Sequence, residues 1–567
     1  MTQKVETVRH EGRLRVGRGW ETISLIIIAV GTFLTRMLPL SFSQLPFNND
    51  AITESQLASN VLQTGHLSAI IDGHLGAAHS SAMPAYNVIV AYAASVFGVT
   101  PFEVSQVIIA VVSVATITGI YVLGKTFSSS PRGGLTASLM ALLMGTFVLT
   151  TGSAWKEAMG IGLLVFALVT FIRRSEPRFL GLCLCTLMLL PLVHHLVTVV
   201  TLMTLAYIVV WSWYYALKNR SLKQRNARDL VLLAVPSAWT AIYYVSFSLD
   251  RLQVISSPGK VLLIILAFAL LCLLQILILS MRTHSKSTFA PIPGIAIIVV
   301  LVLDYFGFFF PYKPSAPLEY LFLVFSFGVA LSIAWYGIEY ALENLPKYRA
   351  IYPGLLLAPV TILGFGVAEG FTITSHQIIY RSFDFVDIFI FLGAGIAVSS
   401  AYHLKRARLY RAISIAIMVS LVVSFPFAYY TGQLLGVRHD TQAFEVDASL
   451  WLPVDQPDFH VVTDERLSYI MNATAGVPKE GGLAFYLTHN YSLRPNWFLA
   501  VEDSYTRTGV NAYPDGLVVI PIFNLTQLAD ASNVVYVGGP EGDRLQLFIS
   551  TITGRGVVFP YAAPRYP

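Results

Sequence analysis

Apolar segments separated by short polar gaps fill residues 1–430 of this 567-residue chain, and this alternation limits the folds open to it. Hydrophobic residues make up 55% of the sequence and charged residues only 12%, about half the charged share of a soluble domain. Because a single soluble core rarely grows beyond about 250 residues, so long an apolar region favours lipid as its solvent. The sequence therefore predicts a polytopic α-helical membrane protein.

The basic residues in the polar gaps predict which side of the membrane each gap occupies. Short cytoplasmic loops are rich in Lys and Arg, and a spanning helix needs about 20 apolar residues. Placing the basic gaps in the cytoplasm gives about thirteen transmembrane helices, with the N-terminus inside. This assignment requires residues 84–98 to form a helix at the outer interface rather than a crossing. The basic gaps are 125–132, 173–178, 218–228, 282–286, 347–349 and 403–411.

The last part of the chain, residues 431–567, has the composition of a soluble domain, and the odd number of crossings places it outside the cytoplasm. Its short apolar runs at 516–521 and 533–538 are separated by Gly, Pro and Asn turns, which predicts a small α/β domain. Three glycosylation sequons favour the same side of the membrane, at Asn472, Asn490 and Asn524. We expect an integral protein of the plasma membrane with three parts: a basic N-terminus (1–20), a transmembrane domain (21–430) and a soluble extracytoplasmic domain (431–567).

Charged and histidine side chains collect at the predicted outer face. The first external loop, about residues 43–102, has no Lys or Arg but carries acidic residues and histidines, among them Asp50, Glu54, His74 and His79. Later outer turns add a further set, namely Lys156, Glu157, His194, His195, Lys313 and Arg381. External basic residues run against the usual charge bias, and a phosphate-bearing ligand at the outer leaflet would explain them.

Each of these residues also has a purely structural interpretation. Asp50 precedes the helical run 51–67 and fits a simple N-cap. Lys156 and Glu157 fit a local charge pair, and Arg36, near the outer end of the first helix, fits a side chain that extends to the interface. His74 and His79 are compatible with solvent-exposed loop residues, and His194 and His195 with a hydrated helix end. It is the gathering of so many polar residues on one face that favours a functional site.

The first 160 residues carry a pattern that resembles a known family. The basic-ended first helix is followed by the segment PFNNDAITE (46–54), by the expected interfacial helices, and by MPAYNVIVAY (83–92) with Phe97-Gly98 before the next span. This pattern resembles the GT-C superfamily of membrane glycosyltransferases, particularly the polyprenyl-phosphate-sugar-dependent type of archaea and bacteria. That family has many membrane helices, an acidic residue just after the first, and often a C-terminal extracytoplasmic domain. The Trp-Trp-Asp-Tyr-Gly motif of oligosaccharyltransferases is absent, so the sugar and the acceptor stay open.

The resemblance implies an inverting transfer of a sugar from a polyprenyl-phosphate donor to a glycan or protein acceptor on the extracytoplasmic face. It implies Asp50, together with Glu54, as the catalytic carboxylates that activate the acceptor hydroxyl. Fixed cations would stabilise the leaving phosphate, in the order Arg381, Lys313 and Lys156. Other side chains would position the substrates, namely His194, His195, Glu157, His74 and His79. No cofactor is required; a divalent cation held by Asp50 and the histidines is compatible with the pattern, but the spacing identifies no metal.

Two other classes of function remain open at this stage. A transporter or lipid flippase would favour charged residues at mid-membrane and inverted repeats; Asp304 and Glu369 lie in apolar runs, and no clear repeat is evident. A non-catalytic membrane assembly factor would bind a partner through its C-terminal domain and would tolerate substitution in the acidic loop. No basic aromatic tract points to nucleic acid.

Overall fold

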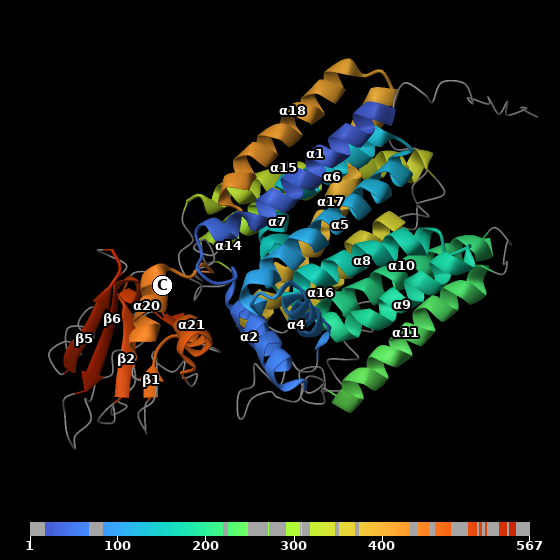
Figure 1. Cartoon of the computed structure of the whole chain (residues 1–567). Helices are drawn as coiled ribbons and strands as arrows, with labels where there is room; N and C mark the ends of the chain where they lie inside the picture. Colours follow the sequence, from blue (N-terminus) through green and yellow to red (C-terminus); the bar gives the residue numbers. More distant parts are fainter. Residues whose placement is uncertain are drawn as a thin grey trace, which may run out of the picture.

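Long helices make up most of the chain, and a small sheet domain follows them (Figure 1). The computed structural model describes residues 18–66, 83–218, 225–247, 270, 291–306, 308, 318–345, 351–368, 373–429, 439–452, 460–477, 497–506, 510–512, 516–518, 532–540 and 544–550. The predicted positions of Lys313, His74 and His79 lie outside the described residues.

The helical part begins with α1 (Arg18–Met37) and the short 3-10 turn η1 (Leu38–Ser41). The described residues of the first predicted external loop form two helices, α2 (Asn49–Thr64) and α4 (Ala85–Phe97), which confirms that the runs 51–67 and 84–98 are largely helical where they are described. The other helices among the described residues are α5 (Pro101–Ser128), α6 (Pro131–Leu143), α7 (Gly145–Gly152), α8 (Lys156–Ile172), α9 (Pro177–Val193), α10 (His195–Lys218), α11 (Arg225–Phe247), α14 (Ile292–Tyr305), α15 (Tyr320–Asn344), α16 (Ile351–Ala368), α17 (Ile373–His403), α18 (Ala407–Ser424) and the turn η3 (Phe425–Phe427).

Seven of the described helices are long and apolar enough to cross a membrane, and the bent pair α6–α7 would make an eighth. Four further apolar helices are shorter, α4, α9, α14 and α16. The chain is therefore an integral membrane protein. The count of about thirteen crossings stays a prediction, because the segment 248–290 lies almost entirely outside the described residues.

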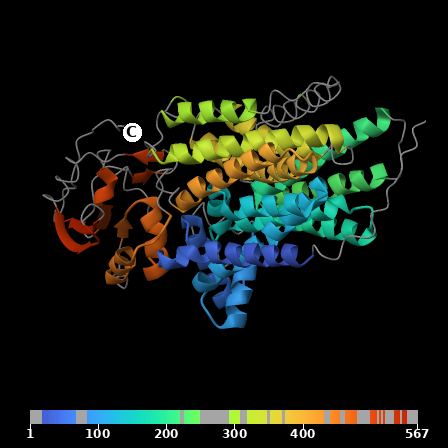
Figure 2. The ribbon, with the colours of Figure 1, turned by 90° about the horizontal axis from the view of Figure 1, so that it is seen from above.

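Helix α17 forms the centre of the bundle. Within its membrane-length part, residues 381–403, 94% of the most apolar 18-residue stretch is buried. Helix α17 packs against α15, α16, α6 and α5 (Figures 1 and 2). Its approach to α15 depends on glycine, because a Cβ added at Gly337 would overlap the carbonyl oxygen of Gly393. Small residues at such contacts let two helix backbones approach closely, which fixes α17 in one position.

The helix pair α6–α7 is broken by a bend of 68° at Met144. A broken helix leaves carbonyl groups without their usual donors, and such groups are costly in an apolar interior. Arg36 satisfies two of them, since its Nη1 donates to Leu142 O at 2.7 Å and its Nη2 to Ala141 O at 2.9 Å. Arg36 is fully buried and also bonds the Thr151 hydroxyl, so the interpretation that it extends to the interface is wrong.

The C-terminal part contains a four-stranded mixed sheet in the order β1-β2-β6-β5. Strand β1 is parallel to β2, while the β2–β6 and β6–β5 pairs are antiparallel, and β3 pairs with β4 in a separate hairpin. The predicted run at 533–538 matches β5, and residues 516–518 of the run at 516–521 form β4, while residues 519–521 lie outside the described residues. The elements are α20 (Ala443–Trp451), β1 (His460–Val462), α21 (Glu465–Ala475), β2 (Trp497–Glu502), η4 (Asp503–Thr506), β3 (Val510–Ala512), β4 (Gly516–Val518), β5 (Ser532–Gly538) and β6 (Leu545–Ser550).

The C-terminal domain lies at one end of the bundle, beside the start of α2 (Figure 1). Its core, formed by residues such as Leu467, Ile470 and Leu499, also includes Ile52 from α2, which is 1% exposed. The hydrophobic core of this domain is thus completed by a helix from the other end of the sequence.

Candidate active site

Helix α2 presents Asp50 in its first turn. The side chain of Asn48 accepts a hydrogen bond from Asp50 N at 2.9 Å, and the helix ends at Gly65 in a left-handed conformation. Asn48 is therefore the N-cap, and the interpretation of Asp50 as the cap is wrong. Because the cap position is already filled, the Asp50 carboxylate is available for other contacts, and its side chain is 56% exposed.

Arg381, in the third turn of α17, faces Asp50. The Nη2 atom of Arg381 lies 4.0 Å from Asp50 Oδ2, and its Nε lies 3.8 Å from Glu157 Oε2. The guanidinium also lies 5.6 Å from the centre of the Trp155 ring, whose negative face attracts a cation. With a side chain 24% exposed, Arg381 connects an exposed carboxylate to a buried one.

The buried carboxylate is Glu157, in the first turn of α8, whose side chain is 1% exposed. His194 Nε2 lies 4.0 Å from Glu157 Oε2, and His194 occupies the junction between α9 and α10. Its Nδ1 accepts a hydrogen bond from Val197 N at 3.4 Å. A neutral imidazole that accepts at Nδ1 carries its proton on Nε2, which is the atom that faces Glu157. His195 stacks on His194 with ring centres 4.9 Å apart.

A second ion pair lies next to this group. Lys156 Nζ is 2.7 Å from Glu54 Oε1, and the two side chains are only 10% and 3% exposed. The side-chain amide of Asn87 donates to Glu54 twice, to Oε2 at 2.7 Å and to the backbone carbonyl at 2.9 Å. The interpretation of Lys156 and Glu157 as a local pair is therefore wrong, because each bonds a different distant partner. The Glu54 contacts join α2, α4 and α8 into one unit.

Two acidic residues that the sequence analysis did not consider extend the polar group into the bundle. Asp384 Oδ1 lies 2.8 Å from the Thr150 hydroxyl, and Asp387 Oδ2 lies 2.7 Å from the Thr146 hydroxyl. Both carboxylates are buried, and both contact α7, the short helix after the break. The sequence contains a pattern that could have identified them. Three charged residues at helical spacing begin an apolar run there, namely Arg381, Asp384 and Asp387.

Within the described residues, the structure thus brings together six of the ten candidate residues in two adjoining groups: Asp50, Arg381, Glu157 and His194, with Glu54 and Lys156 beside them. His195 joins them through its stacking contact with His194. Among the described residues, no group of three or more His, Cys, Asp or Glu side chains has an arrangement that could hold a metal ion. The remaining three candidates belong to the parts of the chain that are not described.

No protein-family model matches the sequence, and no curated protein is significantly similar to it. Solved structures do match. The oligosaccharyltransferase of Archaeoglobus fulgidus, solved with a tethered acceptor peptide, aligns over 97% of this chain and 76% of its own, with a TM-score of 0.55 and 13% identity. The chain has a GT-C fold. The arabinofuranosyltransferase AftD from Mycobacteria aligns over 95% of this chain but only 40% of its own, with a TM-score of 0.50 and 13% identity. The polar group connects α2 with α8 and α17. Helix α2 itself lies at the end of the bundle beside the C-terminal domain (Figure 1).

Proposed function

We propose that the chain is a membrane glycosyltransferase that moves a sugar from a polyprenyl-phosphate donor to an acceptor on the extracytoplasmic face. The observation that carries this proposal is the pairing of an exposed carboxylate, Asp50, with a half-buried guanidinium, Arg381, on a GT-C fold. A base for the acceptor and a cation for the leaving group are the two charges that such a transfer needs.

In the proposed reaction, Asp50 takes the proton of the acceptor hydroxyl as that oxygen attacks the anomeric carbon of the donor sugar. The bond between this carbon and the phosphate oxygen breaks, and its electron pair leaves on the phosphate. Arg381 stabilises the charge that develops there, because a guanidinium matches the geometry of a phosphate. Attack from the face opposite the phosphate inverts the anomeric configuration.

The surrounding residues would support these two groups. Glu157, buried behind Arg381, holds the guanidinium toward the Asp50 side, and His194 neighbours Glu157. The buried pair of Glu54 and Lys156 fixes α2 against α8, so we assign these two residues to the support of Asp50 rather than to contact with the sugar. The proposed roles of Lys313, His74 and His79, and of a divalent cation, stay as predictions from the resemblance.

Sugar transfer by the full-length chain in membrane vesicles tests the proposal directly. The probes are radiolabelled undecaprenyl-phosphate and dolichyl-phosphate sugars, with membrane lipids and proteins as acceptors. We expect transfer from at least one donor, and a loss of about 10²- to 10⁴-fold in Asp50→Asn. Glu103→Gln is the matched control, because Glu103 is an exposed carboxylate that caps α5 and glutamine can also fill that capping position.

The other outcomes distinguish the alternatives. Equal transfer by Asp50→Asn and the unmodified chain would remove Asp50 from the chemistry. Movement of the labelled lipid across the membrane without sugar transfer would indicate a flippase. If the chain neither transfers nor moves any of the probes, an assembly factor becomes the better interpretation.

A further inference from the structure

The loop that leads into α2 is bound by main-chain groups of the C-terminal domain. Gln44 N donates to Thr441 O at 2.9 Å, and Asn48 N donates to His439 O at 2.9 Å. In the opposite direction, Thr441 N donates to Ser43 Oγ at 3.0 Å. Residues 439–441 thus hold both ends of the segment 43–48, immediately before the helix that carries Asp50.

Asn48 has a backbone conformation that normally requires glycine. Its φ is 98° and its ψ is 137°, a region in which a side chain is strained unless surrounding contacts hold it. The hydrogen bond from its N–H to His439 O is such a contact, and the residue is 5% exposed. On its other side, the Asn48 side chain caps α2 through Asp50 N. One strained residue therefore joins the C-terminal domain to the first turn of α2.

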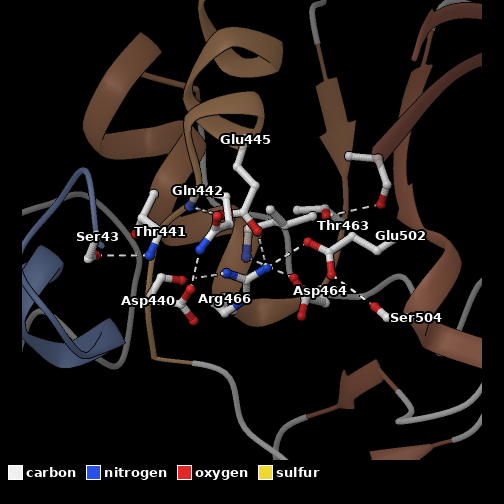
Figure 3. Close-up of polar contacts among 12 residues, drawn as sticks. Ser43, Asp440, Thr441, Gln442, Glu445, Thr463, Asp464, Arg466, Glu502 and Ser504 are labelled. Atoms are coloured by element: carbon white, nitrogen blue, oxygen red, sulfur yellow. Dashed lines mark hydrogen bonds and ion pairs between the residues drawn. The ribbon is translucent and has the colours of Figure 1, made fainter. Parts of the chain in front are cut away.

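Segment 439–441 is itself anchored inside the C-terminal domain by Arg466 (Figure 3). Arg466 Nη1 donates to Asp440 O at 3.0 Å, while Nη2 bonds Glu502 Oε1 at 2.6 Å and also Glu445. These three side chains come from α21, β2 and α20, and all of them are buried. Because the guanidinium is bound on both sides, the position of Asp440, and with it its two neighbours, is fixed by the folded domain.

Aromatic packing reinforces the same contact. Phe47, which is 1% exposed, lies 5.3 Å from the Tyr429 ring and 5.8 Å from the His439 ring, measured between ring centres. Two further contacts lie about one turn apart on α2, where Ile52 enters the core of the C-terminal domain and Gln56 Nε2 donates to Asn472 O at 3.4 Å. These contacts attach one face of α2 to the C-terminal domain.

We propose that the C-terminal domain is the positioning element of the active site. Its segment 439–441 holds Asn48 in the strained conformation, and Asn48 fixes the first turn of α2 so that the Asp50 carboxylate stays beside Arg381. Asn48 and Ser43 are positioning residues in this proposal, since they act through Asp50. The claim that the position of Asp50 affects catalysis rests on the proposed function. The claim that the C-terminal domain orders the first turn of α2 does not.

Hydrogen exchange of the full-length protein in lipid nanodiscs tests the first step without any substrate. In Asn48→Ala and in Ser43→Ala we expect the amides of residues 50–55 to exchange about 5- to 10-fold faster, because the first change removes the cap of α2 and the second removes a bond between the preceding loop and the C-terminal domain. Exchange in α21 should not change, which would show that the C-terminal domain is still folded. Ser41→Ala is the matched control, because the Ser41 hydroxyl bonds within its own turn, to Leu38 O.

Two conservative variants separate positioning from general loss of structure. Asn48→Asp keeps an oxygen that can accept from Asp50 N, and Ser43→Thr keeps the hydroxyl that accepts from Thr441 N. We expect both to retain slow exchange in residues 50–55. Unchanged exchange in Asn48→Ala and Ser43→Ala would overturn the proposal, because the contacts with the domain would then not order the turn.

The second step is measured with the donor that the unmodified chain uses, chosen from the labelled polyprenyl-phosphate sugars. We expect Ser43→Ala to lower kcat about 10-fold with little change in donor KM, since a misplaced base affects the reaction rather than ground-state binding. Ser43→Thr should restore kcat. Faster exchange with an unchanged kcat would overturn the catalytic part of the proposal. If the unmodified chain uses none of the donors, the proposed function fails, while the exchange result still decides whether the C-terminal domain orders α2.

Discussion

The Arg381 guanidinium lies 4.0 Å from the Asp50 carboxylate, where the central helix α17 meets the peripheral helix α2. On its other side, Arg381 is 3.8 Å from Glu157, a carboxylate that is almost fully buried. The cation is thus held from behind, while the side chain in front of it is accessible to a substrate. The proposed division of roles between a fixed cation and an exposed base depends on this asymmetry.

Replacement of Arg381 should affect the reaction more than the fold. We expect Arg381→Met to lower kcat/KM about 10²- to 10³-fold, because the developing phosphate charge loses its fixed donor. Arg381→Lys keeps the positive charge but cannot form two parallel hydrogen bonds to a phosphate, so its activity should lie between that of the unmodified chain and that of Arg381→Met. Steady-state transfer kinetics with a labelled polyprenyl-phosphate sugar measure the effect. Arg381→Met with full activity would show that another group binds the phosphate.

Disruption of the buried pair of Glu54 and Lys156 should destabilise the protein. Removing one partner of such a pair typically costs about 3–5 kcal/mol, because the remaining charge is left buried without its counter-charge. We therefore expect Glu54→Gln and Lys156→Met each to lower the apparent unfolding temperature in detergent. The double variant should lose less than the sum of the two, since it removes both charges together. Additive losses would mean that the two side chains do not stabilise one another.

Arg36 should be needed for the broken helix pair α6–α7. Arg36→Met removes the donors to Leu142 O and Ala141 O, and each unsatisfied buried carbonyl costs roughly 1–3 kcal/mol. We expect a clear fall in the apparent unfolding temperature, with a smaller fall in Arg36→Lys. Arg178→Met is the control, because Arg178 forms an exposed pair with Glu176, and surface pairs contribute little. Equal stability of Arg36→Met and Arg178→Met would contradict the assignment.

The contact between the C-terminal domain and α2 should weaken in acid through His439. Burial lowers the pKa of His439 from 6.5 to about 4, against the opposing attraction of Asp440 and with the added repulsion of Arg466. A histidine with a lowered pKa stabilises the folded state above its unfolded pKa, and this contribution is lost as the pH falls from 6.5 toward 4.

The pH effect can be measured as the apparent unfolding temperature of the full-length protein over that range. His439→Phe is the informative variant, because phenylalanine can pack against Phe47 but does not titrate. We expect the unmodified chain to lose stability between pH 6.5 and 4 more steeply than His439→Phe. Parallel curves would show that other groups control the acid response.

The sequence was sufficient to predict the class of fold, because helix length and apolar composition depend on local residues. It also singled out Asp50, Glu157, His194 and Arg381 from their unusual places in polar turns, and the structure brings these four side chains together. Periodicity and charge bias carry such information because the bilayer limits where polar groups can lie.

The pairing of those side chains could not be predicted from sequence. Lys156 bonds Glu54 rather than its neighbour Glu157, because consecutive residues in a helix point in different directions and distant helices decide their partners. Arg36 was misinterpreted for the same reason. Its guanidinium donates to carbonyl groups at a helix break more than a hundred residues away in the sequence, and no local pattern in the first helix reveals that break.

The burial of α17 has a consequence for how a substrate enters. A helix that touches α5, α6, α15 and α16 can shift only if the whole bundle rearranges, so Arg381 is the stationary member of its pair with Asp50. At 4.0 Å, the two charged groups leave no space for a phosphate between them. In the proposed reaction, a donor phosphate would therefore have to reach Arg381 from beside Asp50 rather than from between the two groups. The C-terminal domain, which holds the strained residue before α2, would then set the position of Asp50 relative to this fixed cation, so that a domain outside the helical bundle would be a determinant of turnover.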